Sequence, residues 1–339
     1  EAGAILGAQV IVGDMDQVAF ESSYGVRSVS DSTAVDSETQ FCIGSCSKPF
    51  TSALLMTLVQ DETLVLDKSI DAWLPEFESL KTSSGDNARA PTLRELLSHR
   101  GGIYSQKVGM TKRQTMWIRD FKLTLEDAVE GIAGEPLLAD PGETYAYSGA
   151  GYCVIGRVAE VATKQSFESL LQEKISAPLQ LSRTTYFPDP NDPNIATGSL
   201  RGKLNQSTPH LSMPFQLSLV GGSVYSTAKD SARFLQMVVN RGATEDGRLL
   251  SADIFDEYTR RQVEGQGYGL GWSLQIKNRK TVELTHSGSL ASSRALFMVN
   301  LETGVYGAIL YTVGNPQASK NLGRSVSQSL ADVVRGAAN

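Results

Sequence analysis

The order of the predicted elements constrains the fold most, because strand-like segments occupy both ends of the chain and helical patterns fill the middle. Residues 8–25 alternate around the turn sequence GDMD and predict a β-hairpin. The last third contains four further strand-like segments and a closing amphipathic helix, with the sequences GLGWSLQIK, KTVELTH, SRALFMVNLETG, VYGAILYTVG and ASKNLGRSVSQSLADVVRG. We therefore expect the two ends to share one sheet.

Between these ends, apolar residues recur three and four positions apart, which predicts helices in TLRELLSHRGG, TLEDAVEGIAG, GYCVIGRVAEVATK and SFESLLQEKI. The predicted fold class is α/β (α+β), with an antiparallel sheet that is flanked by helices and built from both chain ends. Residues 1–60 and 217–339 are predicted to form this discontinuous sheet domain. Residues 61–216 are predicted to form an inserted, mostly helical domain, with a functional cleft between the two.

Composition excludes some classes of function. The 339 residues are 41% hydrophobic, enough for a sizeable core, and 31 basic against 37 acidic residues give a net charge of −6. No nucleic-acid partner is expected from this balance. No apolar run approaches the ~18 residues of a membrane span. The opening EAGAILGAQV does not resemble a targeting segment, so we expect export to the periplasm or medium if a signal peptide was removed, and a cytoplasmic location otherwise.

Cysteine and histidine residues give no metal signature. Three cysteines, Cys42, Cys46 and Cys153, form no dense framework and are interpreted as mostly buried thiols. The three histidines are too scattered for a zinc motif, so neither a metal nor a cofactor is expected. The glycine-rich sequence GGSVYS at 221–226 lacks the lysine of a phosphate-binding loop.

Polar residues concentrate where a buried helix is predicted to begin, in the sequence CIGSCSKPFTSALLM at 42–56. Pro49 is tolerated only in the first turn of a helix, so the helix must begin near Ser45. Ser45 and Lys48 then lie on one face of that turn. Free N–H groups there can stabilise an oxyanion, and burial would lower the pKa of the Lys48 amine, which makes Ser45 a candidate nucleophile.

The alternative is that Ser45 and Ser47 are helix N-caps and that Lys48 is a surface residue. An isolated Ser-x-x-Lys sequence is more often of this kind.

Six ordered segments, of which the first contains Ser45 and Lys48, carry a family resemblance. They are GSCSKPFTSALLMTLVQDETLVLDKSIDAWLPEF, PTLRELLSHRGGI, DPGETYAYSGAGYCVIGRVAEVAT, GGSVYSTAKDSARFLQMVVNRG, YGLGWSLQ and THSGSLASSRALFMVNLETG. The chain resembles the serine β-lactamase and penicillin-binding-protein superfamily. The similarity is to the class C β-lactamase-like branch, with its D-alanyl-D-alanine carboxypeptidases, D-aminopeptidases and family VIII carboxylesterases. It implies the β-lactamase/transpeptidase-like fold.

The resemblance implies catalytic roles for three residues. Ser45 is the nucleophile, Lys48 its partner, and Tyr147 a general base and acid whose phenolate the Lys48 charge favours. The family's Tyr-x-Asn motif reads Tyr147-Ser148-Gly149, so the asparagine that contacts acylamide substrates is absent. Gly149 therefore weakens the expectation of strong β-lactamase activity. A packed core role for Tyr147 is the alternative, although Tyr145 is the stronger core candidate of the two tyrosines.

The third family motif, Lys-Thr-Gly in class C β-lactamases and His-x-Gly in several relatives, reads His286-Ser287-Gly288. The resemblance places the oxyanion hole at the N–H groups of Ser45 and Ser289. Gly149, His286, Ser287 and Gly288 are the expected substrate-binding residues, and Gly288 would let the strand approach the substrate closely.

The predicted function is that of a metal-free serine hydrolase working through an acyl-enzyme on an ester or amide, carboxylesterase-like or D-peptidase-like, with a small-molecule or short-peptide substrate. A β-lactamase or D,D-carboxypeptidase proper is one alternative, and a catalytically weak binding or scaffold protein is another. A Ser-His-Asp triad using His99, His210 or His286 is disfavoured because no G-x-S-x-G sequence occurs. Substrate, acyl acceptor and oligomeric state stay open.

Residues 100–120 and 185–215 are predicted to set specificity. Tyr104, Met110, Met116 and Trp117 either line an apolar acyl pocket or make ordinary core contacts.

Overall fold

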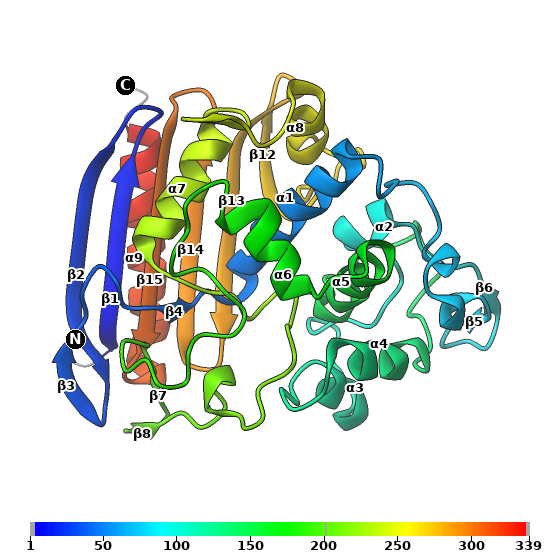
Figure 1. Cartoon of the computed structure of the whole chain (residues 1–339), viewed down its shortest axis with the longest axis horizontal. Helices are drawn as coiled ribbons and strands as arrows, with labels where there is room; N and C mark the ends of the chain where they lie inside the picture. The colour runs from blue at the N-terminus through cyan, green and yellow to red at the C-terminus, as the bar shows by residue number, and fades with distance from the viewer. Residues whose placement is uncertain (1–3, 201, 337–339) are drawn as a thin grey trace.

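The computed structural model describes residues 4–200 and 202–336 of the chain (Figure 1). Within these residues, a seven-stranded sheet has the order β12-β13-β14-β15-β1-β2-β3, and its neighbouring strands are antiparallel. Its strands are β1 (Ile5–Gly13), β2 (Val18–Ser28), β3 (Asp31–Ala34), β12 (Ser273–Lys277), β13 (Lys280–Leu290), β14 (Ser293–Asn300) and β15 (Val305–Val313).

The two ends of the chain meet in this sheet. β1 pairs with β15 from Ile5 opposite Val313 to Gly13 opposite Tyr306. β1 and β2 form the predicted hairpin, whose turn is held by the Asp14 carboxylate, which accepts the N–H of Gln17 at 2.9 Å. The predicted sheet built from both chain ends is therefore confirmed.

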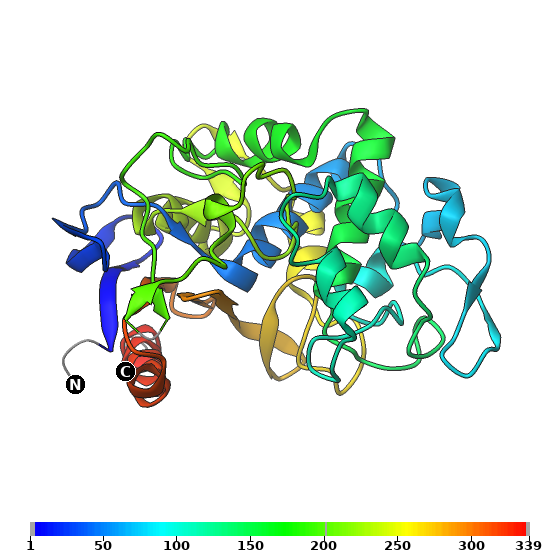
Figure 2. The ribbon, with the colours of Figure 1, turned by 90° about the horizontal axis from the view of Figure 1, so that it is seen from below.

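Alternating side chains of β15 face two different layers. Ala308 and Leu310 lie in the main core with Phe234 of α7 (Ala228–Val239). Ile309 and Tyr311 pack in a second cluster with residues of α9 (Pro316–Gly336). Figure 2 shows α9 on one side of the sheet and most of the chain on the other. The sheet is therefore flanked by helices, as predicted.

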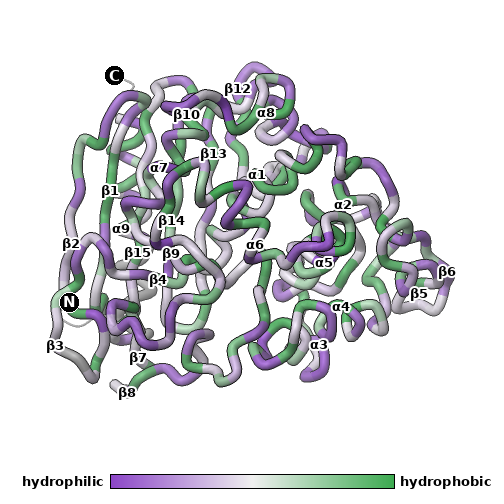
Figure 3. The backbone as a smooth tube through the Cα atoms, viewed as in Figure 1, coloured by the Kyte–Doolittle hydropathy of each residue, from purple (hydrophilic) through white to green (hydrophobic). Residues whose placement is uncertain are grey.

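Helix α1 (Ser47–Gln60) lies in the main core and follows a short 3₁₀ turn (Gly44–Cys46). Its Phe50 ring stacks on Phe234 of α7, with centroids 3.9 Å apart. Apolar residues gather along this helix and the central strands (Figure 3). Pro49 occupies the first turn of α1, so the predicted start of the helix is confirmed.

The middle of the chain carries the predicted helices, joined by long loops and turns, and together with the antiparallel sheet they confirm the predicted fold class. Capping boxes begin three of its helices, with Thr92 and Glu95 at α2, Thr111 and Gln114 at α3, and Thr124 and Asp127 at α4. Its helices are α2 (Leu93–Leu97), α3 (Lys112–Trp117), α4 (Leu125–Ala133), α5 (Gly149–Thr163) and α6 (Phe167–Leu171), which continues as a π turn (Gln172–Ser176).

Short elements complete the described fold. Two-residue strands pair as β4 (Phe41–Cys42) with β9 (Tyr225–Ser226), β5 (Leu80–Lys81) with β6 (Asn87–Ala88), β7 (Ser199–Leu200) with β8 (Lys203–Leu204), and β10 (Ala243–Thr244) with β11 (Gly247–Arg248). The remaining helix is α8 (Ala252–Thr259), and 3₁₀ turns lie at Ile70–Ala72, Pro75–Phe77 and Pro209–Leu211. Across residues 4–200 and 202–336, no helix is both long enough and apolar enough to cross a membrane.

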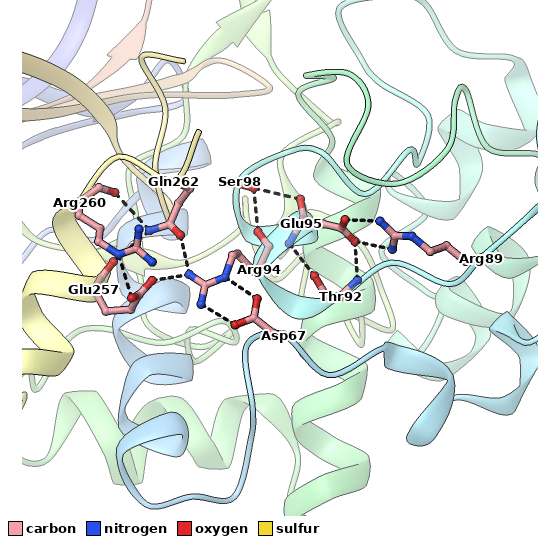
Figure 4. A network of polar contacts seen from close by, with 9 residues as sticks. All are labelled: Asp67, Arg89, Thr92, Arg94, Glu95, Ser98, Glu257, Arg260 and Gln262. Carbon is pink, nitrogen blue, oxygen red and sulfur yellow. Dashed lines mark hydrogen bonds and ion pairs between the residues drawn. The ribbon is translucent and has the colours of Figure 1, made fainter. Parts of the chain in front are cut away.

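A polar network joins the helical region to the rest of the molecule (Figure 4). Arg94 of α2 donates to Asp67 at 2.6 Å, to Gln262 at 2.6 Å and to Glu257 of α8. The contacts with Glu257 and Gln262 join the predicted helical domain, residues 61–216, to the second segment of the predicted sheet domain, residues 217–339. The boundaries themselves stay a prediction.

Candidate active site

Ser45 lies in the 3₁₀ turn that leads into α1, and its side chain is partly exposed. The N-cap of α1 is Cys46, which makes no side-chain capping bond. Ser47 instead links two segments, because its Oγ donates to Gly44 O at 2.6 Å and accepts from the N–H of Val224 at 3.1 Å. The Ser45 hydroxyl is therefore not used as a helix cap.

Lys48 is 1% exposed, which excludes the alternative of a surface lysine. Its Nζ donates to Gly221 O at 2.7 Å and to Ser45 Oγ at 3.4 Å. Burial lowers the pKa of Lys48 to about 7. A substantial share of this amine is therefore uncharged at neutral pH and can accept a proton from Ser45.

Tyr147 lies beside both residues. The Lys48 Nζ is 4.7 Å from the centroid of its ring. Burial raises the pKa of Tyr147, although a hydrogen bond from Ser45 lowers it in part. Burial therefore opposes the Tyr147 phenolate that the Lys48 charge is expected to favour, and the role of Tyr147 as general base and acid stays a prediction. Tyr145 is 39% exposed, so it was wrongly predicted as the core tyrosine of the pair.

Strand β13 runs directly against the turn that carries Ser45. A Cβ added to Gly288 would lie 1.8 Å from Ile43 O, and one added to Gly44 would lie 2.4 Å from Ser289 N. Only glycine at both positions permits this approach. The close contact between β13 and this turn therefore explains why residue 288 is a glycine, and an approach to substrate is not the only reason for it. It also brings the Ser289 N–H beside the turn that carries the Ser45 N–H.

The adjoining edge of β13 is open. Pairing with β12 ends opposite Thr285, whereas β14 continues along β13 to Leu290. The part of β13 that follows Thr285 therefore has one edge without a strand partner among the described residues. An open edge of this kind leaves backbone groups available to a substrate.

His286 is 5% exposed and lies behind this edge. Its Nδ1 is 3.0 Å from Ser287 O and must donate, so its Nε2, 3.0 Å from the Tyr268 hydroxyl, accepts. Burial lowers the pKa of His286 to about 3. The ring is neutral at physiological pH and does not supply the charge of the lysine found there in class C β-lactamases. Ser287 is exposed, and the substrate-binding roles of both residues stay predictions.

Gly149 has a partner that the sequence did not reveal. Its N–H donates to Gln106 Oε1 at 3.0 Å, and a Cβ at Gly149 would lie 2.3 Å from Gln106 Nε2. The Gln106 carboxamide therefore occupies the space beside Gly149 into which an asparagine side chain would project. In the sequence, Gln106 was indicated only by its position within residues 100–120, the segment that is predicted to set specificity.

His99 holds the Tyr147 segment in place. Its Nδ1 accepts the N–H of Ser148 at 3.1 Å, and its ring centroid is 4.2 Å from that of Tyr147. It is 2% exposed, with a φ of 60°, and burial lowers its pKa well below the usual value. These contacts give His99 a structural role beside Tyr147.

A Ser-His-Asp triad finds no support in the described part of the chain. There, none of the three histidines forms an ion pair with a carboxylate or bonds to Ser45. His210 lies in a separate network, with Nδ1 2.9 Å from the Tyr225 hydroxyl.

The predicted thiols are buried. Cys42, Cys46 and Cys153 are free and buried, and burial raises the pKa of each. Cys46 donates to His286 O at 3.2 Å. All three thiols are buried, as predicted, and a raised pKa of this kind makes a thiol unreactive.

The proposed acyl-pocket residues make mostly core contacts. Tyr104 is 2% exposed, and Met110 and Trp117 pack against the main core. Met116 is 40% exposed. The core alternative is therefore favoured for the first three residues.

Comparison with known proteins identifies the family. The model of the family "Beta-lactamase" matches residues 1–329, so the chain belongs to the β-lactamase family. Penicillin-binding protein 4 of Amycolatopsis lactamdurans is 28% identical over 80% of this chain and 71% of its own length. Protein flp of Staphylococcus aureus (strain MW2) is 23% identical over 88% of this chain, which spans only 58% of that protein.

The fold is also found among solved structures. EstCE1, described as a hydrolase with promiscuous acyltransferase activity, superposes with a TM-score of 0.74 at 19% identity. The match covers 92% of this chain and 90% of EstCE1. The chain therefore has the fold of the β-lactamases and penicillin-binding proteins.

Proposed function

We propose that this protein is a serine hydrolase that forms a covalent acyl-enzyme with an ester or amide substrate. The observation that carries the proposal is the buried Lys48 amine, whose Nζ is 3.4 Å from Ser45 Oγ and whose pKa is about 7. A hydroxyl beside an amine that is partly uncharged at neutral pH is an activated nucleophile.

In the proposed reaction, Ser45 Oγ attacks the carbonyl carbon and its proton passes to Lys48 Nζ. The N–H groups of Ser45 and Ser289 stabilise the oxyanion, and the neutral Tyr147 hydroxyl relays a proton to the leaving group. Water, or another alcohol or amine, then attacks the acyl-enzyme and releases the acyl group. The acyltransferase activity named for EstCE1 supports an acceptor other than water.

A carboxylesterase-like or D-peptidase-like substrate fits the site. A cavity of about 630 Å³ is lined in part by Tyr145 and by Tyr268, whose hydroxyl bonds to His286, although neither Ser45 nor Lys48 lines it. Such a volume admits a small molecule or a short peptide.

A β-lactamase or D,D-carboxypeptidase activity is the second candidate. One observation favours it: the Gln106 carboxamide lies beside Gly149, so an amide is present despite the missing asparagine. This amide could bind the acylamide group of a β-lactam or D-peptide.

The test is covalent labelling with a fluorophosphonate, followed by assays with short p-nitrophenyl esters, D-amino acid amides and nitrocefin. Wild type should label and turn over at least one substrate class, and Ser45→Ala should do neither while keeping its melting temperature. A folded wild type that forms no adduct would favour a binding or scaffold protein.

We also propose that the site lies in a cleft between the predicted domains. β13 belongs to the sheet region, whereas Tyr147 and Gln106 belong to the helical region. Substrate would then contact both.

A further inference from the structure

Lys107 lies in a loop that is fixed to the backbone of the candidate site. Ser105 Oγ donates to Tyr147 O at 2.7 Å and accepts the N–H of Lys107 at 3.2 Å. The neighbouring Gln106 accepts the N–H of Gly149 at 3.0 Å. These bonds hold the start of the Lys107 side chain beside the residues around the nucleophile.

The Lys107 ammonium is directed toward the site. Its Nζ lies 5.0 Å from the centroid of the Tyr147 ring, the same ring that Lys48 Nζ approaches to 4.7 Å. The Lys107 side chain is exposed, and among the described residues no carboxylate forms an ion pair with it. A solvent-facing cation therefore lies beside Tyr147 without a protein counter-ion.

Two histidines and one arginine also bear on the charge of this site. His286 and His99 are neutral because burial lowers their pKa values, to which the charges of Lys48 and Lys107 also contribute. Arg119 is a second cation. The residue is partly at the surface, but burial of its guanidinium lowers its pKa, and its charge contributes to the lowered pKa of Lys48. Arg119 also forms no ion pair within the described part of the chain. Because the whole protein carries a net charge of −6, this local excess of positive charge is not a general property of its surface.

We propose that Lys107 binds a carboxylate group of the substrate, with Arg119 contributing to the same positive field. This inference rests on the proposed hydrolase function and specifies its substrate as an anionic ester or amide. When substrate fills the cleft and excludes water, the attraction between a fixed ammonium and a carboxylate strengthens. A cation–π contact with Tyr147 alone is the competing explanation, and it predicts no preference for anionic substrates.

Two matched ester pairs test the proposal and locate the carboxylate. p-Nitrophenyl butyrate and mono-p-nitrophenyl glutarate differ by a carboxylate on the acyl group. Methyl 4-acetoxybenzoate and 4-acetoxybenzoate differ by a carboxylate on the leaving group. Each ester is assayed with wild type, Lys107→Met, Arg119→Met and, as a matched control, Lys112→Met, which alters another exposed lysine of the same segment.

Lys107→Met should lower kcat/KM for the anionic member of one pair by roughly 10- to 100-fold, the effect of losing a charged hydrogen bond. The neutral member should change by no more than about twofold, because the general base and nucleophile are intact. Arg119→Met should reduce the same anionic preference less, and Lys112→Met should leave it unchanged. Equal loss for both members of each pair, or no loss for either anionic member, would overturn the proposal.

A binding measurement separates this proposal from the hydrolase function. Phenylboronic acid and 3-carboxyphenylboronic acid, which add reversibly to an activated serine, are titrated calorimetrically into wild type and Lys107→Met. Tighter binding of the carboxylated compound to wild type, lost in Lys107→Met, supports the inference. Equal binding of both compounds to wild type contradicts it, whereas binding of neither contradicts the activated Ser45 itself. Melting temperatures establish that each variant is folded.

Discussion

The backbone N–H of Gly149 donates to the side-chain Oε1 of Gln106, 3.0 Å away. Gly149 begins α5, whereas Gln106 lies in the loop that follows α2. A side chain at position 149 and the observed Gln106 carboxamide cannot occupy the same space, because the added Cβ would lie 2.3 Å from Nε2. The departure from the family's Tyr-x-Asn motif is therefore coupled to the position of Gln106.

Gly149→Ala should displace Gln106 and lower kcat/KM for the preferred substrate. Gln106→Ala should also lower kcat/KM. In the double variant the clash is absent, so its loss of transition-state stabilisation should be smaller than the sum of the losses in the two single variants. We expect a coupling free energy of about 0.5 to 3 kcal/mol between these contacting positions. Gly151→Ala is the control, since its Cβ would meet Leu96 at an ordinary 3.5 Å. Strict additivity would show that the two sites are independent.

Labelling of Ser45 should depend on pH through Lys48. Because only the uncharged amine accepts a proton, the fluorophosphonate labelling rate should rise with pH and level off above about 7, the pKa of Lys48. Burial is the main cause of this low pKa, and the Arg119 charge contributes. Arg119→Met should therefore move the midpoint to higher pH, whereas the control Arg113→Met should not. A rate that is independent of pH between 5 and 9 would contradict the role of Lys48.

Gly288→Ala should separate β13 from the turn that carries Ser45. Its Cβ would lie 1.8 Å from Ile43 O, so the backbones must move apart and the oxyanion site must widen. We expect a loss of about 2 to 4 kcal/mol in unfolding free energy and at least a ~100-fold fall in kcat/KM. Denaturant unfolding and steady-state kinetics measure both effects. Gly267→Ala is the control, with its nearest neighbour at 3.8 Å, and a Gly288→Ala variant as active as this control would refute the argument.

Arg94→Ala should destabilise the protein by breaking the link between α2 and α8. Its side chain is 23% exposed and pairs with Asp67 and Glu257, so we expect a loss of about 1 to 3 kcal/mol. Arg261→Ala is the control, because its partner Glu264 is 90% exposed and such pairs contribute at most about 1 kcal/mol. Denaturant unfolding compares the two variants. Equal effects would show that the network in Figure 4 does not stabilise the described fold.

Sequence pattern alone predicted the elements and several residues of the site. Strand periodicity at both ends of the chain required a shared sheet, which the pairing of β1 with β15 realises. Pro49 located the start of α1, and the three-residue spacing placed Lys48 beside Ser45. These features are predictable because helix and strand periodicities relate residues that are only a few positions apart, and such short patterns are visible in the sequence.

Tertiary structure alone decided the partners that come from distant segments. Gln106 and Lys107 reach the site because Ser105 bonds to Tyr147, across 42 residues of sequence. Lys48 has its low pKa because the folded chain buries it. The same packing brings Gly221 O, 173 residues away, to its amine as a hydrogen-bond acceptor. Neither contact leaves a periodic trace in the sequence, since it depends on how separate loops and helices pack. The pKa of Tyr147 has the same origin. Its proximity to Lys48 was predictable from the motifs, but the burial that raises this pKa and opposes a phenolate depends on every segment that surrounds the phenol.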